Sequence, residues 1–241
     1  MYIPKLTSVD DFDKQARTIK DHPLGILFNH SIPRTGLASY FSGNRNNSRS
    51  TDSEMCATHV PFFLERSQDG NCRLVAHLAG KNQQIMMLKD NPSCMVVFQG
   101  PNSYVTPAWY PEKEETHKFV PTWDYSCVHV YGKAKIIEDK EWLLRMLNNL
   151  TDQEENKRPE GDKFGSKWKV EQTNQKYLDF LIKGIVGLEI EISHIQSKFK
   201  LHQDQTPKNV NGILNGYEKE MGNDKAKQMC KMLRENYPRE L

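Results

Sequence analysis

Residues 104–132 read YVTPAWYPEKEETHKFVPTWDYSCVHVYG, and this stretch does more than any other to decide the fold. It carries six Trp and Tyr side chains among prolines and ends in a strand-like run. Trp and Tyr combine a flat apolar body with a polar tip, which suits a planar heteroaromatic ligand that needs both stacking and hydrogen bonds. A cluster of this kind is also typical of a protein core next to a turn. The aromatic residues alone leave both interpretations open.

Short blocks outside this stretch give a second, more specific signal. They are MYIPK at the start, ATHVPFFLE at 57–65, AHLAGKN at 76–82, IVGLEIEI at 185–192 and SKFKLHQD at 197–204. Together with YVTPAWY, VPTWDY and VHVYG, they resemble the PaiB-like family of FMN-binding negative transcriptional regulators. One block could arise by chance, but this many in the family's order, over most of the chain, form a strong signal.

The resemblance implies a fold, a cofactor and an assembly. The family is similar to the flavin-reductase-like split barrels, so we expect an α+β protein with a mainly antiparallel, six-stranded split β-barrel of Greek-key type and peripheral helices. It also implies FMN as the cofactor, held near the interface of a homodimer. At 241 residues the chain has room for such a barrel as a single domain over 1–241.

Composition narrows the function classes. There are 33 basic and 31 acidic residues, which gives a formal net charge of +2 and no general attraction to nucleic acid or to anionic membranes. Five widely spaced cysteines form no CxxC pair, which favours reduced thiols. Neither a signal peptide nor a run of about 18 apolar residues is present. We therefore predict a cytoplasmic protein, with the nucleus left open, no membrane partner and no direct binding of nucleic acid.

Hydrophobic periodicity predicts the order of the elements. Strands are expected at 24–29, 56–64, 72–77, 128–136 and 185–192, with a hairpin of 93–99 and 104–106 across Gly100-Pro101-Asn102. Helices are expected at 82–89, 140–151, 177–182 and 218–236, with Asp139 and Asn223 as N-caps of the second and last. Residues 34–54, rich in Ser, Asn and Arg, are expected to form a flexible loop insertion.

The three parts of FMN impose different demands on a site. Its phosphate needs cations or N–H donors, its ribityl chain needs polar side chains, and its ring needs flat walls. Strand alternation places Lys198 and Lys200 on one face, where they could meet the phosphate, although a solvated basic strand end is the plain alternative. The resemblance implies the remaining candidates, which are Thr58, His59, His77, Lys81, Asn82, Thr106, Trp109, Thr122, Trp123 and Gln203. For Asn82 a simple helix N-cap is the alternative.

Two positions depart from the family's pattern. Gly80 stands where the family usually has Arg, and the cation follows one position later as Lys81. A compact ammonium cannot reproduce a bidentate guanidinium, so the phosphate contact is expected to differ. Asp124 stands where the family commonly has Asn. An ionised Asp only accepts hydrogen bonds, so it would repel a ligand carbonyl that an Asn could bind.

Several functions remain open at this point. The principal hypothesis is an FMN-dependent oxidoreductase of unknown substrate, with no catalytic residue assigned. The alternative is a transcriptional regulator, or a flavin-sensing interaction protein without catalysis, and a flavin-free barrel is a third case. No helix-turn-helix with a basic recognition helix is found. No HExxH or Cys/His knuckle predicts a metal site, and a haem contact through His129 or His194 rests on single residues.

Overall fold

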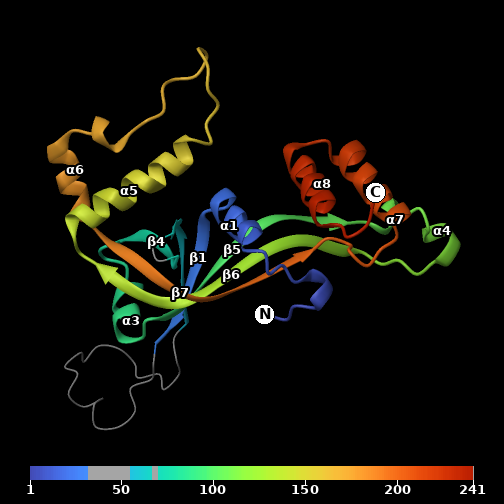
Figure 1. The fold of residues 1–241 in the computed structure, drawn as a ribbon, viewed down its shortest axis with the longest axis horizontal. Helices are drawn as coiled ribbons and strands as arrows, with labels where there is room; N and C mark the ends of the chain where they lie inside the picture. Colours follow the sequence, from blue (N-terminus) through green and yellow to red (C-terminus); the bar gives the residue numbers. More distant parts are fainter. Residues whose placement is uncertain (32–54, 67–69, 241) are drawn as a thin grey trace, which may run out of the picture. The chain divides into compact units, whose positions relative to one another are not determined.

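The computed structural model describes residues 1–31, 55–66 and 70–240, so the predicted insertion at 34–54 lies outside the described residues. The chain is α+β, as predicted. Its residue contacts divide it into two compact units, and Figure 1 draws the helices and strands that belong to them. The first unit contains Met1–His22, Phe98–His129 and Gln196–Leu241, and the second contains Pro23–Val97 and Val130–Ile195. Strands β5, β6 and β7 run through both units, and the single domain over 1–241 stays a prediction.

The described residues form one seven-stranded sheet in the order β2-β1-β5-β6-β7-β4-β3. Its strands are β1 (Leu24–His30), β2 (Met55–Pro61), β3 (Phe63–Arg66), β4 (Cys72–Ala79), β5 (Ser93–Val105), β6 (Thr122–Ile137) and β7 (Ile185–Lys200). The pairs β1–β2, β1–β5, β3–β4 and β4–β7 are antiparallel. The antiparallel character is therefore confirmed.

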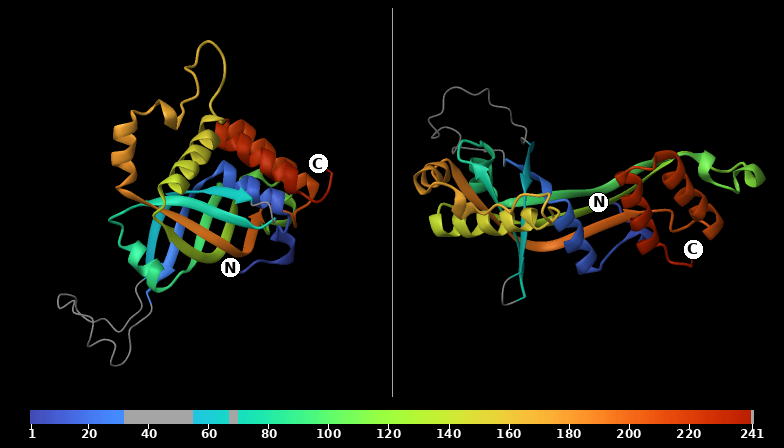
Figure 2. Two further views of the ribbon diagram at one scale, coloured as in Figure 1. Left: turned by 60° about the vertical axis from the view of Figure 1, so that its left-hand side comes forward. Right: turned by 90° about the horizontal axis from the view of Figure 1, so that it is seen from above.

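The predicted count of six strands is wrong, and Phe62 explains the difference. The expected strand at 56–64 is divided at this residue into β2 and β3, which lie at the two ends of the strand order. Because a single residue joins these two strands, the two edges of the sheet must approach each other there. The strands of the second unit accordingly curl around a common interior (Figure 2). The Phe62 side chain is completely buried.

The predicted hairpin across Gly100-Pro101-Asn102 is also wrong, because β5 continues through these residues as one strand. Gly100 serves close packing instead of a turn. A Cβ atom at this position would lie 2.1 Å from the Ser126 Oγ atom of β6. Glycine inside a strand often marks such a close approach of a neighbouring chain segment.

Helices α5 (Lys140–Glu155) and α6 (Gln175–Ile182) pack together in the second unit. The Asp139 carboxylate accepts a hydrogen bond from Trp142 N at 2.7 Å, which confirms the predicted N-cap of α5. The buried cluster under these helices contains Val75, Leu143, Met146, Val170, Leu178 and Ile182. The shorter α3 (Gln84–Asp90) and η3 (Val170–Gln172) belong to the same unit.

The first unit carries the other helices of the described residues. They are η1 (Lys5–Thr7), α1 (Phe12–Asp21), η2 (Pro107–Trp109), α4 (Lys113–Thr116), α7 (Pro207–Gly216), η4 (Tyr217–Met221) and α8 (Asp224–Asn236). The helix predicted over 218–236 thus comprises the π-helical η4 and then α8. Between them Gly222 adopts a left-handed φ of 59°, a conformation that glycine accepts readily. Asn223 caps α8 as predicted, with its Oδ1 2.9 Å from Ala226 N.

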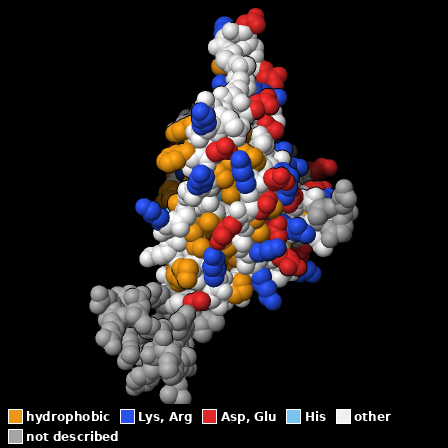
Figure 3. Space-filling model, turned by 90° about the vertical axis from the view of Figure 1, so that its left-hand side faces the viewer, with side chains coloured by type: hydrophobic (Ala, Val, Ile, Leu, Met, Phe, Trp, Pro, Cys, Tyr) orange, Lys and Arg blue, Asp and Glu red, His pale blue; other side chains and the backbone are white. Residues whose placement is uncertain are grey.

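Hydrophobic side chains reach the surface at several places. Figure 3 faces the side on which α6 lies and shows them among Lys, Arg, Asp and Glu side chains. Helix α6 exposes Tyr177, Phe180 and Leu181, while its opposite face contributes Leu178 and Ile182 to the buried cluster. No helix in the described part of the chain combines the length and apolar character needed to cross a membrane. The five cysteines are free thiols, and Cys94, Cys127 and Cys230 are buried.

Phe62→Ala should lower the free energy of unfolding by about 3–5 kcal/mol, because it removes a buried ring and leaves a cavity. Phe180→Ala is the matched control, since Phe180 is 70% exposed and the same change there should cost less than about 0.5 kcal/mol. Urea unfolding of both variants measures the difference. Similar losses of unfolding free energy at the two positions would show that burial of Phe62 between β2 and β3 does not stabilise the fold.

Candidate functional site

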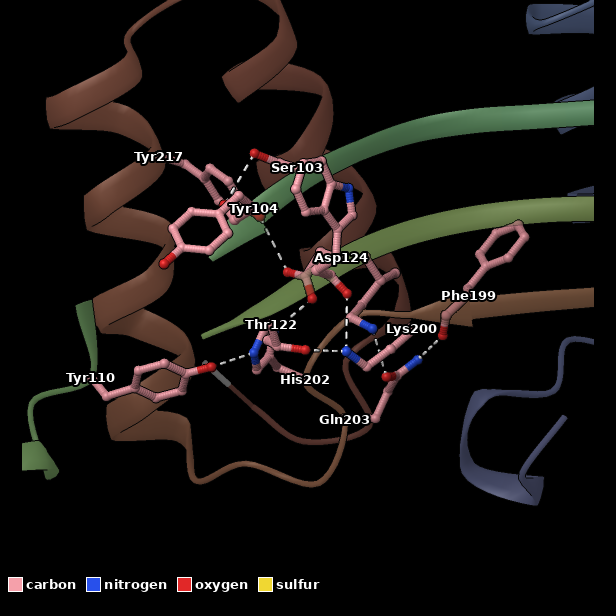
Figure 4. Close-up of polar contacts among 12 residues, drawn as sticks. Ser103, Tyr104, Tyr110, Thr122, Asp124, Phe199, Lys200, His202, Gln203 and Tyr217 are labelled. Atoms are coloured by element: carbon pink, nitrogen blue, oxygen red, sulfur yellow. Dashed lines mark hydrogen bonds and ion pairs between the residues drawn. The ribbon is translucent and has the colours of Figure 1, made fainter. Parts of the chain in front are cut away.

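Four buried side chains of the first unit form a continuous polar network (Figure 4). The Asp124 Oδ1 atom lies 2.7 Å from His202 Nδ1, and Asp124 Oδ2 accepts a hydrogen bond from the Tyr217 hydroxyl at 3.2 Å. On the other side of the imidazole, His202 Nε2 lies 2.5 Å from the Tyr110 hydroxyl. We call Tyr110, Asp124, His202 and Tyr217 the buried polar network.

The members of the buried polar network come from four separate segments of the chain. Asp124 is the third residue of β6, His202 lies two residues after β7, Tyr110 follows η2 and Tyr217 begins η4. His202 has a left-handed φ of 60°, which is uncommon and unfavourable for a residue with a side chain. Contacts on both ring nitrogens hold it there. The network therefore ties the start of β6 to the end of β7 and to the C-terminal helices.

Electrostatics fix the direction of the hydrogen bonds. Burial raises the pKa of Tyr110, and the nearby Asp124 carboxylate raises it further. Burial and then the Asp124 charge raise the pKa of Tyr217 in the same way. Both phenols consequently keep their protons and can donate. The Tyr110 hydroxyl can therefore donate to His202 Nε2, while His202 Nδ1 faces Asp124 Oδ1.

The Asp124 carboxylate, which departs from the family pattern, is directed to partners inside the first unit. Its side chain is completely buried, and His202 and Tyr217 contact its two carboxylate oxygens. Burying a carboxylate is costly unless polar groups meet it, and here the Tyr217 hydroxyl donates to one oxygen while the His202 imidazole lies beside the other. The Asp at this position is explained by its partners inside the protein.

Lys200 lies at the edge of the buried polar network and contacts two other predicted site residues, Thr122 and Trp123. Its Nζ atom donates to Thr122 Oγ1 and, at 3.0 Å, to the backbone carbonyl of Trp123. The Trp123 indole is 49% exposed and meets the Tyr104 ring edge to face, with centroids 6.1 Å apart. We call Lys200, Thr122, Trp123 and Tyr104 the Lys200 cluster. It presents an ammonium group, a hydroxyl and two exposed aromatic rings.

Lys198 shares the strand face of Lys200 but has different partners. Its Nζ atom donates to the Tyr2 carbonyl at 3.2 Å. The same ammonium lies 5.6 Å from the Tyr2 ring centroid and 5.8 Å from that of Tyr125. Such distances are within the range of cation–π attraction. The two lysines thus belong to separate contact groups.

Trp109 is packed inside the first unit. Its ring meets Tyr217 edge to face at 5.1 Å, and a Cβ atom on Gly216 would lie 2.2 Å from the indole. Its Nε1 atom is buried without a hydrogen-bond partner among the described residues. Stacking of Trp109 on a flavin stays a prediction, and it would require this packing to open.

Gln203 and Thr106 support local backbone. The Gln203 amide accepts from Leu201 N at 2.8 Å and donates to Phe199 O at 2.5 Å. Thr106 Oγ1 accepts from Ala108 N at 3.3 Å at the start of η2. Their proposed roles in binding a cofactor stay predictions.

The other predicted residues lie in the second unit, where Asn82 links two of them. Asn82 Nδ2 donates to Thr58 Oγ1 at 3.3 Å, and Asn82 Oδ1 accepts from Gln84 N, at the start of α3, at 2.9 Å. The second contact joins Asn82 to the first turn of α3, although the N-cap position itself is held by Gln83. His59, next to Thr58 in β2, is exposed. Consecutive strand residues point to opposite faces, so Thr58 and His59 cannot act from one side of β2.

His77 and Lys81 have different environments within this unit. His77 pairs with Gly187 of β7, and its Nδ1 atom is buried without a hydrogen-bond partner among the described residues. Burial lowers the pKa of His77. Lys81 is exposed. Its neighbour Gly80 packs closely, because a Cβ atom there would lie 3.2 Å from the Gly184 carbonyl oxygen.

Metal and haem hypotheses gain no support. No group of three His, Cys, Asp or Glu side chains in the described ranges could hold a metal ion. The His194 ring is stacked on Tyr131, with centroids 4.3 Å apart and an interplanar angle of 5°. Burial lowers the pKa of His129.

Sequence reasoning missed the buried polar network as a unit. Tyr217 and Asp124 are 93 positions apart, and no local pattern connects a helical tyrosine to a strand aspartate. His202 was visible only as part of the block SKFKLHQD. Sequence reasoning also missed a buried amide pair in the second unit, where Gln84 Nε2 donates to Asn29 Oδ1 at 2.9 Å.

The fold and the Lys200 cluster define an α+β protein with a curled antiparallel sheet and a cationic, aromatic surface site. A family model described as "Putative FMN-binding domain" matches residues 1–194. The chain therefore belongs to this family, and both the resemblance to PaiB-like proteins and FMN as the cofactor are confirmed at the level of the family.

Individual proteins are similar to this chain over most of its length. An uncharacterized protein of Saccharomyces cerevisiae is 48% identical over 170 residues, which cover 69% of this chain and 98% of that protein. Protease synthase and sporulation protein PAI 2 of Bacillus subtilis is 29% identical over 185 residues, covering 77% of this chain and 83% of that one. Among solved structures, the FAD and heme binding protein from Mycobacterium smegmatis shares the fold with a TM-score of 0.50. It is 12% identical and is matched over 85% of this chain and 79% of its own.

Proposed function

We propose that this protein binds FMN and acts as an FMN-dependent oxidoreductase whose substrate is not yet assigned. The observation that carries the proposal is the family match over residues 1–194, whose description names FMN. A bound FMN supplies a ring that takes up and releases electrons, while the protein supplies binding and orientation. No residue is assigned a catalytic role.

The Lys200 cluster fits part of what FMN requires. A phosphate monoester is bound by charged donors and hydroxyl groups, and the cluster offers the Lys200 ammonium beside the Thr122 hydroxyl. A flat ring needs aromatic surface, and Trp123 and Tyr104 are 49% and 45% exposed. We therefore propose that Lys200 and Thr122 hold the phosphate of the flavin.

The alternative is a regulator or a flavin-sensing protein that does not catalyse a reaction. It would use the same cofactor, so only the behaviour of the bound flavin separates the two functions. The formal net charge of +2 gives no general attraction to nucleic acid, and direct contact with DNA forms no part of the proposal. We also propose a cytoplasmic location, on the basis of the sequence alone.

We further propose a homodimer that uses the outward face of β2, β1 and β5 in the second unit. The register aligns Ala57, Phe28 and Met95 in one row across the three strands. A second row contains His59, Ile26 and Val97. These side chains are exposed or half-buried, and apart from His59 they are apolar. Such a face is typical of a surface that pairs with a second copy.

Mixing the purified protein with FMN should quench the flavin fluorescence through contact with aromatic rings. Lys200→Ala should weaken FMN binding by about 1.5–3 kcal/mol, as expected for a charge-assisted bond, and change riboflavin binding little. Lys231→Ala, at an exposed lysine of α8, is the control and should change neither. Unaltered fluorescence at micromolar FMN would contradict cofactor binding, and equal losses for both ligands would show that Lys200 does not hold the phosphate.

Under anaerobic conditions, the FMN-loaded protein should lose its visible flavin absorption when NADH or NADPH is added. The colour should return on exposure to air, because an oxidoreductase must pass its electrons to an acceptor. Free FMN with the same nicotinamide is the control. A bound flavin that neither nicotinamide reduces would favour the sensing alternative over catalysis.

Light scattering should give twice the chain mass of 28.0 kDa for the wild type. Ala57→Arg should give monomers, because it places a charge in the centre of the proposed interface. Met86→Arg, at a 63% exposed residue of α3, should remain dimeric. A wild-type monomer at high concentration, or equal behaviour of the two variants, would rule out this interface.

A further inference from the structure

The Lys200 cluster and the buried polar network connect the same two segments of the chain. Lys200 at the end of β7 contacts Thr122 and the Trp123 carbonyl at the start of β6. Two residues further along each segment, His202 meets Asp124 at 2.7 Å. Strands β6 and β7 are neighbours in the sheet. The two contacts are therefore successive links between one pair of segments, the first partly exposed and the second buried.

The buried link has the properties of a fixed support. Asp124 is completely buried and His202 is 7% exposed, so water has little access to their contact. The left-handed backbone at His202 is unfavourable and is held by the Asp124 and Tyr110 contacts. Loss of the Asp124 contact would let residues 201–203 relax toward a commoner conformation. Lys200 directly precedes these residues.

Lys200 needs such a support. A lysine side chain has a flexible four-carbon stem and loses considerable rotamer freedom when its ammonium is held in one place. Its anchors, Thr122 and Trp123, directly precede Asp124 in β6. The Asp124–His202 contact therefore fixes the backbone at both ends of the Lys200 link.

We infer that the Asp124–His202 pair is a positioning element that holds the Lys200 ammonium in place for a phosphate, and so sets the preference of the site for FMN over riboflavin. The inference rests on the proposed function, in which Lys200 holds the FMN phosphate. Asp124 acts through Lys200, since its buried oxygens contact His202 and Tyr217. A positioning role for the Asp124–His202 pair would explain why position 124 carries Asp where the family commonly has Asn.

A double-mutant cycle of Asp124→Asn and Lys200→Ala tests the inference, with the dissociation constants of FMN and riboflavin as the readout. Asp124→Asn keeps the side-chain size but removes the charge facing His202. It should reduce the FMN-over-riboflavin preference by about five- to tenfold, within the range of couplings between neighbouring residues. In the Lys200→Ala background the same change should leave the preference unaltered within about twofold. His202→Gln provides a second route to the same result if Asp124→Asn fails to fold.

Tyr217→Phe is the matched control, because it removes the other hydrogen bond to Asp124 and leaves the His202 contact in place. It should lower the melting temperature without altering the ligand preference. Equal weakening of FMN and riboflavin by Asp124→Asn, or additive effects in the cycle, would overturn the inference. If Lys200→Ala changes the FMN-over-riboflavin preference and neither Asp124→Asn nor His202→Gln does, the positioning inference fails while the phosphate assignment to Lys200 stands. A preference that does not respond to Lys200→Ala would overturn the phosphate assignment as well.

Discussion

The second unit depends on one constraint, the single-residue connection at Phe62 between two strands at opposite ends of the sheet order. With no loop to span a distance, the sheet has to curl until its edges meet. Curling gives the sheet an inward and an outward face, and the Phe62 side chain at the connection is completely buried. The same curvature decides which residues remain accessible, such as Ala57 and His59 on the outside of β2.

In the first unit a buried carboxylate has the comparable role. Asp124 could not be buried alone, so its presence requires His202 and Tyr217 to converge on it from segments distant in sequence. That convergence fixes the turn after β7 and the C-terminal helices relative to the start of β6. The surface consequence is an ammonium group held beside a hydroxyl and exposed aromatic rings. Structural stability and ligand recognition are thus linked through neighbouring residues of two strands.

The family assignment and the local chemistry support each other from different directions. The match over residues 1–194 names the cofactor but assigns no atoms to it. The Lys200 cluster offers suitable donors. Lys200 and His202 lie beyond the matched residues, so the phosphate contact proposed here depends on the part of the chain that the family model leaves out.

The sequence by itself determined what depends on neighbours along the chain. Alternation in 128–136 and 185–192 predicted parts of β6 and β7, Asp139 and Asn223 were recognisable as helix caps, and ordered blocks identified the family. The tertiary structure decided the rest, because the deciding contacts join distant residues. The Gly100-Pro101-Asn102 triplet carries turn signals, yet it continues a strand in which Gly100 packs closely against Ser126. The sequence marked Asp124 only as a departure from the family pattern, and its buried partner Tyr217, 93 positions away, could not be inferred from local sequence.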